Sequence, residues 1–509
     1  MPIFTELICS MTTCINHDLI KEEVGKFYRY ATLSHTWEGD EPPYEKVIII
    51  AVYDLETSPT HNKLQMFCKI VRDEGFNWAW SDTCCIDKGN HFVLQEALVR
   101  MFKWYEGSAM TIIFLSDVDE HAELGALTMS KWNLRGWTLQ EYHASKVVRI
   151  YTKDWTPYLG LTIHNHKESP EIITEMERAT GISAQSLKEL RPGLKDIRRK
   201  LRLASTRETT RVEDAAYSLL GIFSVTMAVT YGEGDRALGR LLSQLLMSSG
   251  DTSILAWNGK SGSFNGCLPN SVVVFNQPVA LHIPLAIPDA EMETITARLH
   301  ALPLSLDLVR RLYDRVHELP TPTFAGQRMR LPCLAFKIRL VSRRWDGSDF
   351  IFHAQAGALG AVEIKTKEKF TPQDSLCLVH PWIDFLLDRR AARQRARVVS
   401  HGNRTSELDE FVSFDTSPDP SSTSHANPPD SASPPPPSTM LLMHGQIRLY
   451  QFLARLKQSF GALLLISDAW NVAEYRRVAT MYPITVQVQE ITSATLNELI
   501  QGVGRLDVL

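Results

Sequence analysis

A chain of 509 residues is too long for one ordinary domain, and its 44% hydrophobic and 22% charged residues are typical of a globular protein in water. Its formal net charge of -4 is nearly neutral for this length, which argues against nucleic acid or an anionic membrane surface as a partner. Eight cysteines are too few for a disulfide scaffold, and no apolar run is long enough to span a membrane.

The start of the chain does not resemble a secretory signal. The segment "MPIFTELICSMTTC" contains an early acidic residue, Glu6, and lacks a basic stretch. We therefore expect a cytoplasmic protein whose thiols are reduced.

Strand and helix patterns alternate along residues 27–152. Between 62 and 75, for example, Leu64, Phe67, Cys68 and Val71 recur at helical spacing, and a short aromatic segment follows. The expected strands are 27–35, 76–80, 110–118 and 147–152, and the expected helices are 62–75, 93–105 and 138–145. This alternation predicts a parallel sheet with helices on its faces.

Residues 160–260 carry helical patterns. Thr210 and Glu213 have the spacing of a capping box, in which two side chains close a helix N-terminus. A second helix is expected over 235–248, where leucines repeat on one face, and Gly250 is a suitable stop.

The rest of the chain is expected to be rich in strands. Residues 265–388 contain strand candidates at 334–340, 350–354, 361–366 and 375–380. Residues 389–440 are rich in arginine, then in serine and proline, and cannot bury a core, so we predict a disordered linker. Residues 441–509 return to helix and strand patterns and are a candidate to complete the strand-rich domain.

Two motifs that suggest a metal or a cofactor do not have the required spacing. Adjacent Cys84 and Cys85 have no second pair at zinc spacing, and Cys9 and Cys14 stand apart. In "YGEGDRALG" (231–239) the third glycine comes five positions after the second, rather than three, so no dinucleotide fold is expected. We predict no metal and no cofactor. Inert buried thiols are the favoured interpretation of the cysteine pair, and a catalytic Cys–His pair stays open.

Four segments, in this order, share their pattern with one protein family. They are "YATLSHTW" (30–37), "WSDTCCIDK" (80–88), "RGWTLQEYHAS" (135–145), and "RETTRVEDAAYSLLGIF" (207–223) with "YGEGDRALGRL" (231–241). They resemble the fungal heterokaryon-incompatibility (HET) domain proteins, in the form found in mushroom-forming fungi (basidiomycetes). The chain departs from the family at Glu38, which separates Trp37 from the glycine that usually follows it.

The resemblance implies a fold, a domain order and a role. It implies a HET domain over 25–155, similar to the Toll/interleukin-1-receptor (TIR) fold with its parallel sheet flanked by helices, and a helical extension over 156–260. The role implied is non-self recognition, in which incompatibility proteins trigger cell death when unlike hyphae fuse. Some TIR domains hydrolyse NAD with a glutamate, and others only oligomerise. Two hypotheses therefore stand: an enzyme that hydrolyses NAD or a related nucleotide, and a non-enzymatic module that self-associates and recruits cell-death partners.

Acidic residues are the catalytic candidates, because cleavage of a ribosyl bond passes through a cation that a carboxylate stabilises. Glu141 is the first candidate and Asp82 the second. Thr138 and Glu141 also have capping-box spacing, so Glu141 could serve only to close a helix. Asp82 and Asp87, at the end of the 76–80 strand, could instead bind only the backbone of their loop.

Ligand-binding candidates surround these carboxylates. Ser34 and Trp37 follow the first strand, so their loop can converge with the loop that holds Asp82 and Asp87. Arg135 could bind a diphosphate or form a structural salt bridge. Trp37 and Trp137 could stack on a base, although large aromatic residues more often belong to a core.

Overall fold

The computed structural model describes residues 27–278, 282–284, 286–371, 373–387, 437–467, 474–480 and 482–509, with the backbone alone between 437 and 444. These residues belong to two compact units. The first unit takes in the chain up to Ser248 together with Asn270–Asn276, and the second takes in Ser249–Pro269 and the chain from Gln277 onward.

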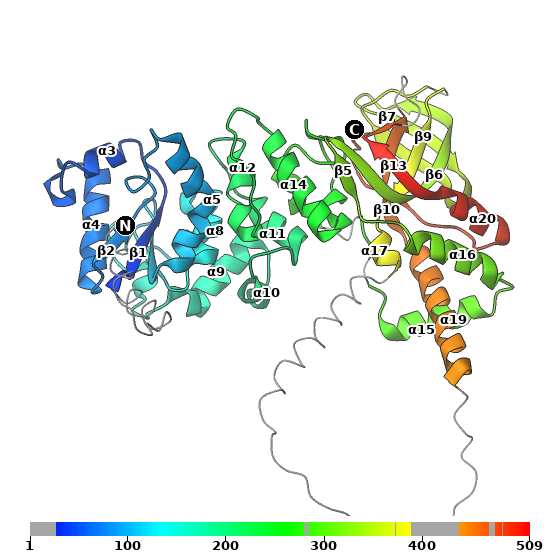
Figure 1. Cartoon of the computed structure of the whole chain (residues 1–509), viewed down its shortest axis with the longest axis horizontal. Coiled ribbons are helices and arrows are strands. Elements are labelled where there is room, and N and C mark those ends of the chain that lie inside the picture. The colour runs from blue at the N-terminus through cyan, green and yellow to red at the C-terminus, as the bar shows by residue number, and fades with distance from the viewer. Residues whose placement is uncertain are drawn as a thin grey trace, which may run out of the picture. The chain divides into compact units, whose positions relative to one another are not determined.

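Within the described residues of the first unit, four parallel strands form a sheet in the order β2-β1-β3-β4. The strands are β1 (Tyr30–His35), β2 (Trp78–Trp80), β3 (Met110–Phe114) and β4 (Val148–Tyr151). The helices between them include α4 (Pro59–Asp73), α5 (His91–Gly107) and α8 (Thr138–Ala144) (Figure 1). The predicted alternation of strands and helices is therefore confirmed.

Both faces of this sheet are covered, as its apolar central strands require. Neighbouring side chains on a strand point to opposite faces, so Ile112 packs in a cluster with Leu64 and Phe67 of α4, whereas Ile113 packs on the other side with Trp132. Because the four strands are parallel, their carboxyl ends all lie at the same edge of the sheet. That edge carries the polar loops described below.

The helical segment that follows contains α9 (Pro170–Thr180), α10 (Ala184–Glu189), α11 (Ile197–Ala204), α12 (Asp214–Tyr217), α13 (Leu220–Phe223) and α14 (Arg236–Ser249). The helix predicted over 235–248 is confirmed as α14. The capping box predicted at Thr210 and Glu213 is wrong, because no side chain caps α12. The Glu213 carboxylate instead accepts the backbone N–H groups of Gly232 and Gly234 at 2.8 and 2.9 Å, and thereby holds the glycine loop.

Among the described residues of the second unit, nine strands join in one sheet. They are β5 (Thr323–Ala325), β6 (Arg328–Trp345), β7 (Phe350–Ala356), β8 (Gly360–Thr366), β9 (Leu376–His380), β10 (Phe460–Ser467), β11 (Glu474–Arg477), β12 (Ile484–Val486) and β13 (Val503–Val508). The four strands predicted between 334 and 380 are thus confirmed. Because β10 pairs with β9, and β13 pairs with β6, strands from beyond residue 459 lie in the same sheet as those before 381.

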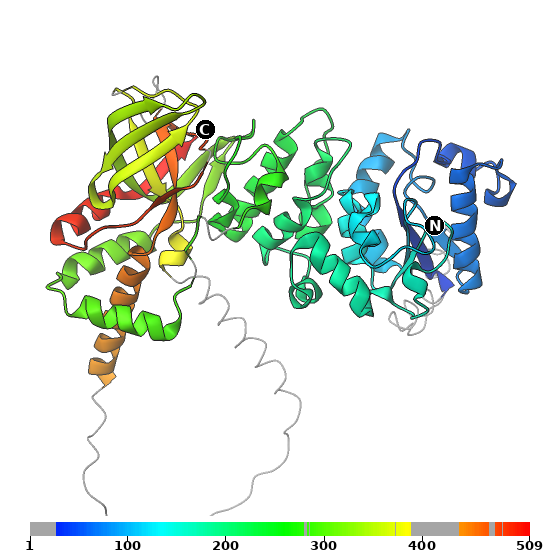
Figure 2. The same cartoon turned by 180° about the vertical axis from the view of Figure 1, so that it is seen from behind.

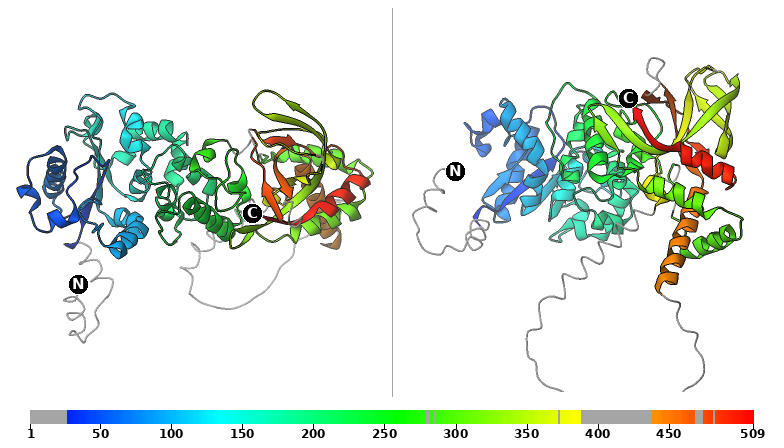
Figure 3. Two further views of the ribbon diagram at one scale, coloured as in Figure 1. Left: turned by 90° about the horizontal axis from the view of Figure 1, so that it is seen from above. Right: turned by 45° about the vertical axis from the view of Figure 1, so that its right-hand side comes forward.

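Helices cover this second sheet. Helix α20 (Ser493–Gly502) packs against β6, and Figure 2 shows it, in red, below the long strands. Helices α15 (Asp289–His300) and α19 (Pro437–Leu456) lie side by side (Figure 3). The linker predicted over 389–440 lies outside the described residues up to 436. No helix in the described part of the chain is long and apolar enough to cross a membrane.

Candidate functional site

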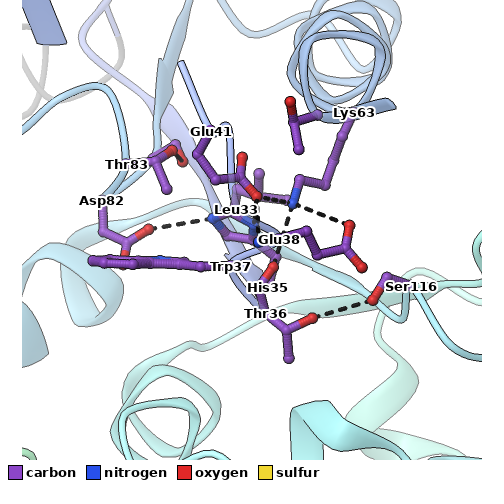
Figure 4. A network of polar contacts seen from close by, with 12 residues as sticks. Leu33, His35, Thr36, Trp37, Glu38, Glu41, Lys63, Asp82, Thr83 and Ser116 are labelled. Atoms are coloured by element: carbon purple, nitrogen blue, oxygen red, sulfur yellow. Dashed lines mark hydrogen bonds and ion pairs between the residues drawn. The ribbon is translucent and has the colours of Figure 1, made fainter. Parts of the chain in front are cut away.

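Polar residues from several elements meet at the carboxyl ends of β1, β2 and β3. The chain leaves β1 toward β2 on one side and leaves β3 toward β4 on the other, so the strand order reverses between β1 and β3. In open α/β sheets this is the point where the loops part and ligands bind. Here Thr36, after β1, lies 3.2 Å from Ser116, after β3, through their hydroxyl groups (Figure 4).

Asp82, in the loop after β2, is buried at this edge and is only 6% exposed. Its Oδ2 accepts the indole N–H of Trp37 at 3.0 Å, and its Oδ1 lies 3.3 Å from Nε2 of His35 (Figure 4). Burial alone would raise the pKa of Asp82, but the hydrogen bond and charge of His35, with the charges of Arg135 and Lys88, bring the pKa below its ordinary value. Asp82 is therefore a buried carboxylate that stays ionised.

A second set of charges lies behind His35. Its Nδ1 is 3.7 Å from Oε1 of Glu41, which in turn forms an ion pair with the buried amine of Lys63. The same amine donates to the carbonyl oxygen of Thr36 at 3.3 Å and lies 3.7 Å from Glu38 (Figure 4). Lys63 therefore ties the loop that follows β1 to helix α4.

Glu141, on α8, is buried against β1 and is 2% exposed. The Ser34 hydroxyl donates to its Oε2 at 2.5 Å, and Ser34 Oγ in turn accepts the indole N–H of Trp132 at 2.8 Å. Burial, and then the negative charge of Asp82, raise the pKa of Glu141 to about 8, although Arg135 and the Ser34 hydrogen bond act in the opposite direction. Glu141 is therefore a neutral acid at neutral pH.

The capping-box interpretation of Glu141 is wrong. Thr138 is the first residue inside α8, and no side chain caps the helix. The Thr138 hydroxyl instead donates to the carbonyl oxygens of Trp132 and Arg135, which precede the helix, at 2.7 and 2.8 Å. The buried guanidinium of Arg207 then donates to Thr138 Oγ1 at 2.9 Å and fixes this turn. The carboxyl group of Glu141 is left free of the helix end and points to β1.

Cations and an indole form the outer side of the site. Trp37 is 47% exposed, and the Nζ of Lys88 lies 3.9 Å from the centroid of its ring. The guanidinium carbon of Arg135 lies 4.8 Å from the same ring. Both cations interact favourably with the face of an indole. Because Trp37 also donates to Asp82, it separates that carboxylate from solvent.

Five of the seven residues proposed from the sequence lie in this site: Ser34, Trp37, Asp82, Arg135 and Glu141. Asp87 accepts the backbone N–H groups of Gly89 and Asn90 at 3.0 and 3.1 Å. The indole of Trp137 is hydrogen-bonded to Asp214 in α12. Asp87 is thus bound within its own loop, and Trp137 is bound to the helical segment.

Sequence reasoning missed His35, Lys63, Lys88 and Arg207. Lys63 had a detectable signal, because it lies four residues before Phe67 on the apolar side of α4, where a lysine needs a charged partner. Arg207 is far from α8 in sequence, so no local pattern connects the two. Within the described residues, no group of three or more His, Cys, Asp or Glu side chains is arranged to hold a metal.

The arrangement combines two buried carboxyl groups with opposite ionisation. Pairs of this kind let one group act as an acid while the other stabilises positive charge. Arg135 and Lys88 add donors that suit phosphate oxygens. The site can therefore support cleavage of a bond whose transition state is cationic at a sugar carbon.

Comparison with known proteins shows which family part of the first unit resembles. Residues 30–129 match the family described as heterokaryon incompatibility protein (HET). The chain is also 34% identical, over 235 residues, to the vegetative incompatibility protein HET-E-1 of Podospora anserina. That similarity covers 43% of this chain and 16% of the relative, so the chain spans only a small part of the relative's length. No solved structure matches the chain.

Proposed function

Because the chain is a HET-domain protein, with a family match over residues 30–129, we propose that it is an effector of vegetative incompatibility in a fungus and causes cell death after unlike hyphae fuse. The similarity to the incompatibility protein of Podospora anserina supports this role. It runs over 235 residues and therefore extends beyond the family match into neighbouring parts of the chain.

The proposed reaction is hydrolysis of the N-glycosidic bond of NAD or a related nucleotide. The observation that carries it is the split ionisation of Asp82 and Glu141 at the strand ends. As the base departs, positive charge develops on the ribose, and the ionised Asp82 is the group suited to stabilise it. Nicotinamide leaves NAD as a neutral molecule, whereas a purine must gain a proton, and the neutral Glu141 is suited to supply that proton.

The outer residues suit the remaining parts of a dinucleotide. Arg135 and Lys88 both lie against the indole of Trp37. A diphosphate that takes the place of this ring could therefore bind both cations through its charged oxygens without moving either cation far. Trp37, once released, offers a ring on which a base could stack.

Access to Asp82 requires movement of Trp37, since the carboxylate is 6% exposed and accepts the indole N–H. The indole is itself 47% exposed, so it can swing outward without leaving a packed core. In this proposal the substrate competes with Trp37 for Asp82, Arg135 and Lys88.

The test uses the purified full-length chain with NAD and, separately, with ATP, and measures free nicotinamide and free adenine by chromatography. We expect base release by the wild type, and a fall of roughly 10²–10³ in rate for Asp82→Asn with either substrate. Glu141→Gln should slow adenine release more than nicotinamide release, because only adenine needs the proton. The matched control is Glu175→Gln, which changes a buried carboxyl group that accepts Thr128 N–H and Tyr158 O–H, at 3.0 and 2.7 Å, in another part of the unit.

Two results would contradict the proposal at different levels. If the folded wild type releases no base from either nucleotide, the hydrolase mechanism is wrong, and growth arrest would then point to non-enzymatic assembly with partner proteins. If expression of the full chain leaves a fungal host growing normally, with the protein confirmed in the cells, the effector role is wrong.

A further inference from the structure

The turn at residues 133–138 leads into α8 and carries Arg135 to the candidate site. Its backbone pairs with the loop that joins α11 to α12 in the helical segment. The Glu208 N–H donates to the carbonyl oxygen of Leu134 at 2.6 Å, and the Gly136 N–H donates to the carbonyl oxygen of Glu208 at 2.7 Å. Arg135 and Glu208 thus form an isolated parallel bridge. The position of the turn is therefore set by a part of the chain that comes much later in the sequence.

The side chain of Arg207, which is only 8% exposed, adds hydrogen bonds at the same place. Its Nη1 donates to the carbonyl oxygen of Arg135 at 3.0 Å and to Oγ1 of Thr138 at 2.9 Å. Its Nη2 donates to Oδ1 of Asn133 at 3.1 Å. The donors therefore span the turn from its first residue to its last, a geometry that suits the planar fork of a guanidinium and not the point charge of a lysine amine.

Two further contacts hold the turn against the helical segment. A Cβ atom added at Gly136 would stand 2.5 Å from Cγ2 of Thr209, so a side chain at this glycine would push the two segments apart. The indole of Trp137 is hydrogen-bonded to the carboxylate of Asp214. Within the described residues Arg207 forms no ion pair, and its three side-chain acceptors are neutral groups of this turn. A buried guanidinium is costly without such partners, so the turn and Arg207 stabilise each other.

The side chain of Arg135 has little support of its own. Its Nε is buried and has no hydrogen-bond partner in the described part of the chain. The guanidinium carbon lies 4.8 Å from the centroid of the Trp37 ring, and the proposed entry of a substrate moves this ring. The position of Arg135 therefore depends on its backbone, which Arg207 and Glu208 hold.

We propose that Arg207 is a positioning residue, which ties the helical segment to the turn at 133–138 and thereby holds Arg135 in the candidate site. The helical segment is then a part of that site, although the family match over residues 30–129 ends before it. This inference rests on the proposed function only for what Arg135 does with a substrate. The coupling of the two segments is independent of the reaction.

Hydrogen exchange of the wild-type full-length chain, followed by mass spectrometry, tests the coupling without any substitution. Peptides that contain Gly136 and Glu208 should be protected to the same extent, because one opening event exposes both amides. Exchange of either amide at the rate of an exposed loop would overturn the coupling.

Arg207→Lys should raise the exchange rate of both peptides at least about ten-fold, the ratio expected for one lost hydrogen bond from a charged donor. The matched control is Arg211→Lys, which makes the same substitution in the same loop. Arg211 lies over the ring of Tyr231 at 4.2 Å and should leave both rates unchanged. Equal rates in wild type and Arg207→Lys would show that Arg207 does not hold the turn.

A double-mutant cycle tests the effect on the site, with NAD hydrolysis as the measurement. Arg207→Lys should raise the KM for NAD roughly ten-fold and change kcat less, because it misplaces a group that binds the substrate. In the Arg135→Met background the same substitution should add little, since a positioning residue acts through the group that it places. Equal effects of Arg207→Lys in both backgrounds would assign Arg207 to folding alone and overturn the proposal.

Failure of the proposed reaction is distinguishable from failure of this inference. If the wild type releases no base, the hydrolase mechanism is wrong, and the cycle is then measured as the affinity for ADP-ribose, which carries the diphosphate. Absence of ADP-ribose binding as well would overturn the role of Arg207 in the site.

Discussion

Two carboxyl groups of the same site have opposite pKa shifts because their neighbours differ. Asp82 has His35 and the Trp37 N–H directly against its oxygens, and these favour the ionised form. For Glu141, burial and the charge of Asp82 both raise the pKa, and the hydrogen bond from the Ser34 hydroxyl does not offset them. The opposite pKa shifts of the two carboxyl groups therefore result from their contacts and not from the residue type.

This difference predicts a pH-dependent stability. In the folded chain the pKa of Glu141 is raised from 4.5 to about 8, so between these values the folded state holds a proton that the unfolded state has lost. The free energy of unfolding should therefore fall as pH rises through this window, by up to about 1.4 kcal/mol per pH unit from this one group. Chemical denaturation of wild type and Glu141→Gln across the window measures it, because glutamine does not titrate.

The stability of Glu141→Gln relative to the wild type should thus increase with pH and level off above about pH 8. Asp82→Asn serves as the control, because it removes the second-largest cause of the raised pKa of Glu141. In this variant the pH range over which stability falls should be narrower. A difference between Glu141→Gln and the wild type that stays constant with pH would contradict the assignment.

At the scale of elements, the helical segment is held to the α/β sheet domain by a close helix–helix contact. Gly221, in α13, lies so near α5 that an added Cβ atom would stand 2.1 Å from Cβ of Phe102. The contact is to the stem of the phenylalanine rather than to the end of a flexible side chain, so a rotamer change cannot relieve it. A glycine is therefore required by packing and not by a turn.

Gly221→Ala should destabilise the first unit by roughly 1–3 kcal/mol, the usual cost of overpacking a core. Alanine is a better helix former than glycine, so propensity alone predicts the opposite sign. The control is Gly445→Ala in α19, where an added Cβ meets no atom within 4 Å and a small gain in stability is expected. Thermal unfolding followed by circular dichroism distinguishes the two, and an unchanged or raised midpoint for Gly221→Ala would contradict the packing argument.

At the scale of the whole molecule, the chain crosses between its two units more than once. The segment Ser249–Pro269 belongs to the second unit, although it begins at the last residue of α14, the rest of which belongs to the first. Arg477 of β11 holds it there, since its buried guanidinium donates to the carbonyl oxygens of Trp257 and Leu255 at 2.5 and 3.1 Å and lies over the Trp257 ring at 3.8 Å.

Calorimetry of the full chain should therefore resolve two unfolding transitions, one for each unit. Arg477→Met removes the guanidinium donor to the Trp257 carbonyl oxygen, at a cost of about 1–3 kcal/mol, and should lower one transition while the other stays in place. Arg476→Met is the matched control, because Arg476 forms a half-exposed ion pair with Glu368 worth at most about 1 kcal/mol. A single transition that shifts as a whole would show that the two units unfold together.

The sequence alone determined the strands of the first sheet and the helices between them, because hydrophobic periodicity is a local property; it did not predict helices Asp289–His300 and Leu306–His317. Buried strands such as Tyr30–His35 and amphipathic helices such as Arg236–Ser249 are visible in their own residues, and the parallel sheet follows from their alternation. The meeting of the loops that hold Ser34 and Asp82 could also be anticipated, because parallel strands present their carboxyl ends together.

Only the tertiary structure decided which partner each polar group takes. The sequence spacing of Thr138 and Glu141 suited a helix cap, but Glu141 binds Ser34 from β1, and Thr138 binds Arg207 from a segment about seventy residues away. A capping motif is a local option that a residue gives up when burial brings a distant partner within hydrogen-bond distance. The ionisation of Glu141 and Asp82 depends on such distant neighbours, so no pattern along the chain could have predicted it.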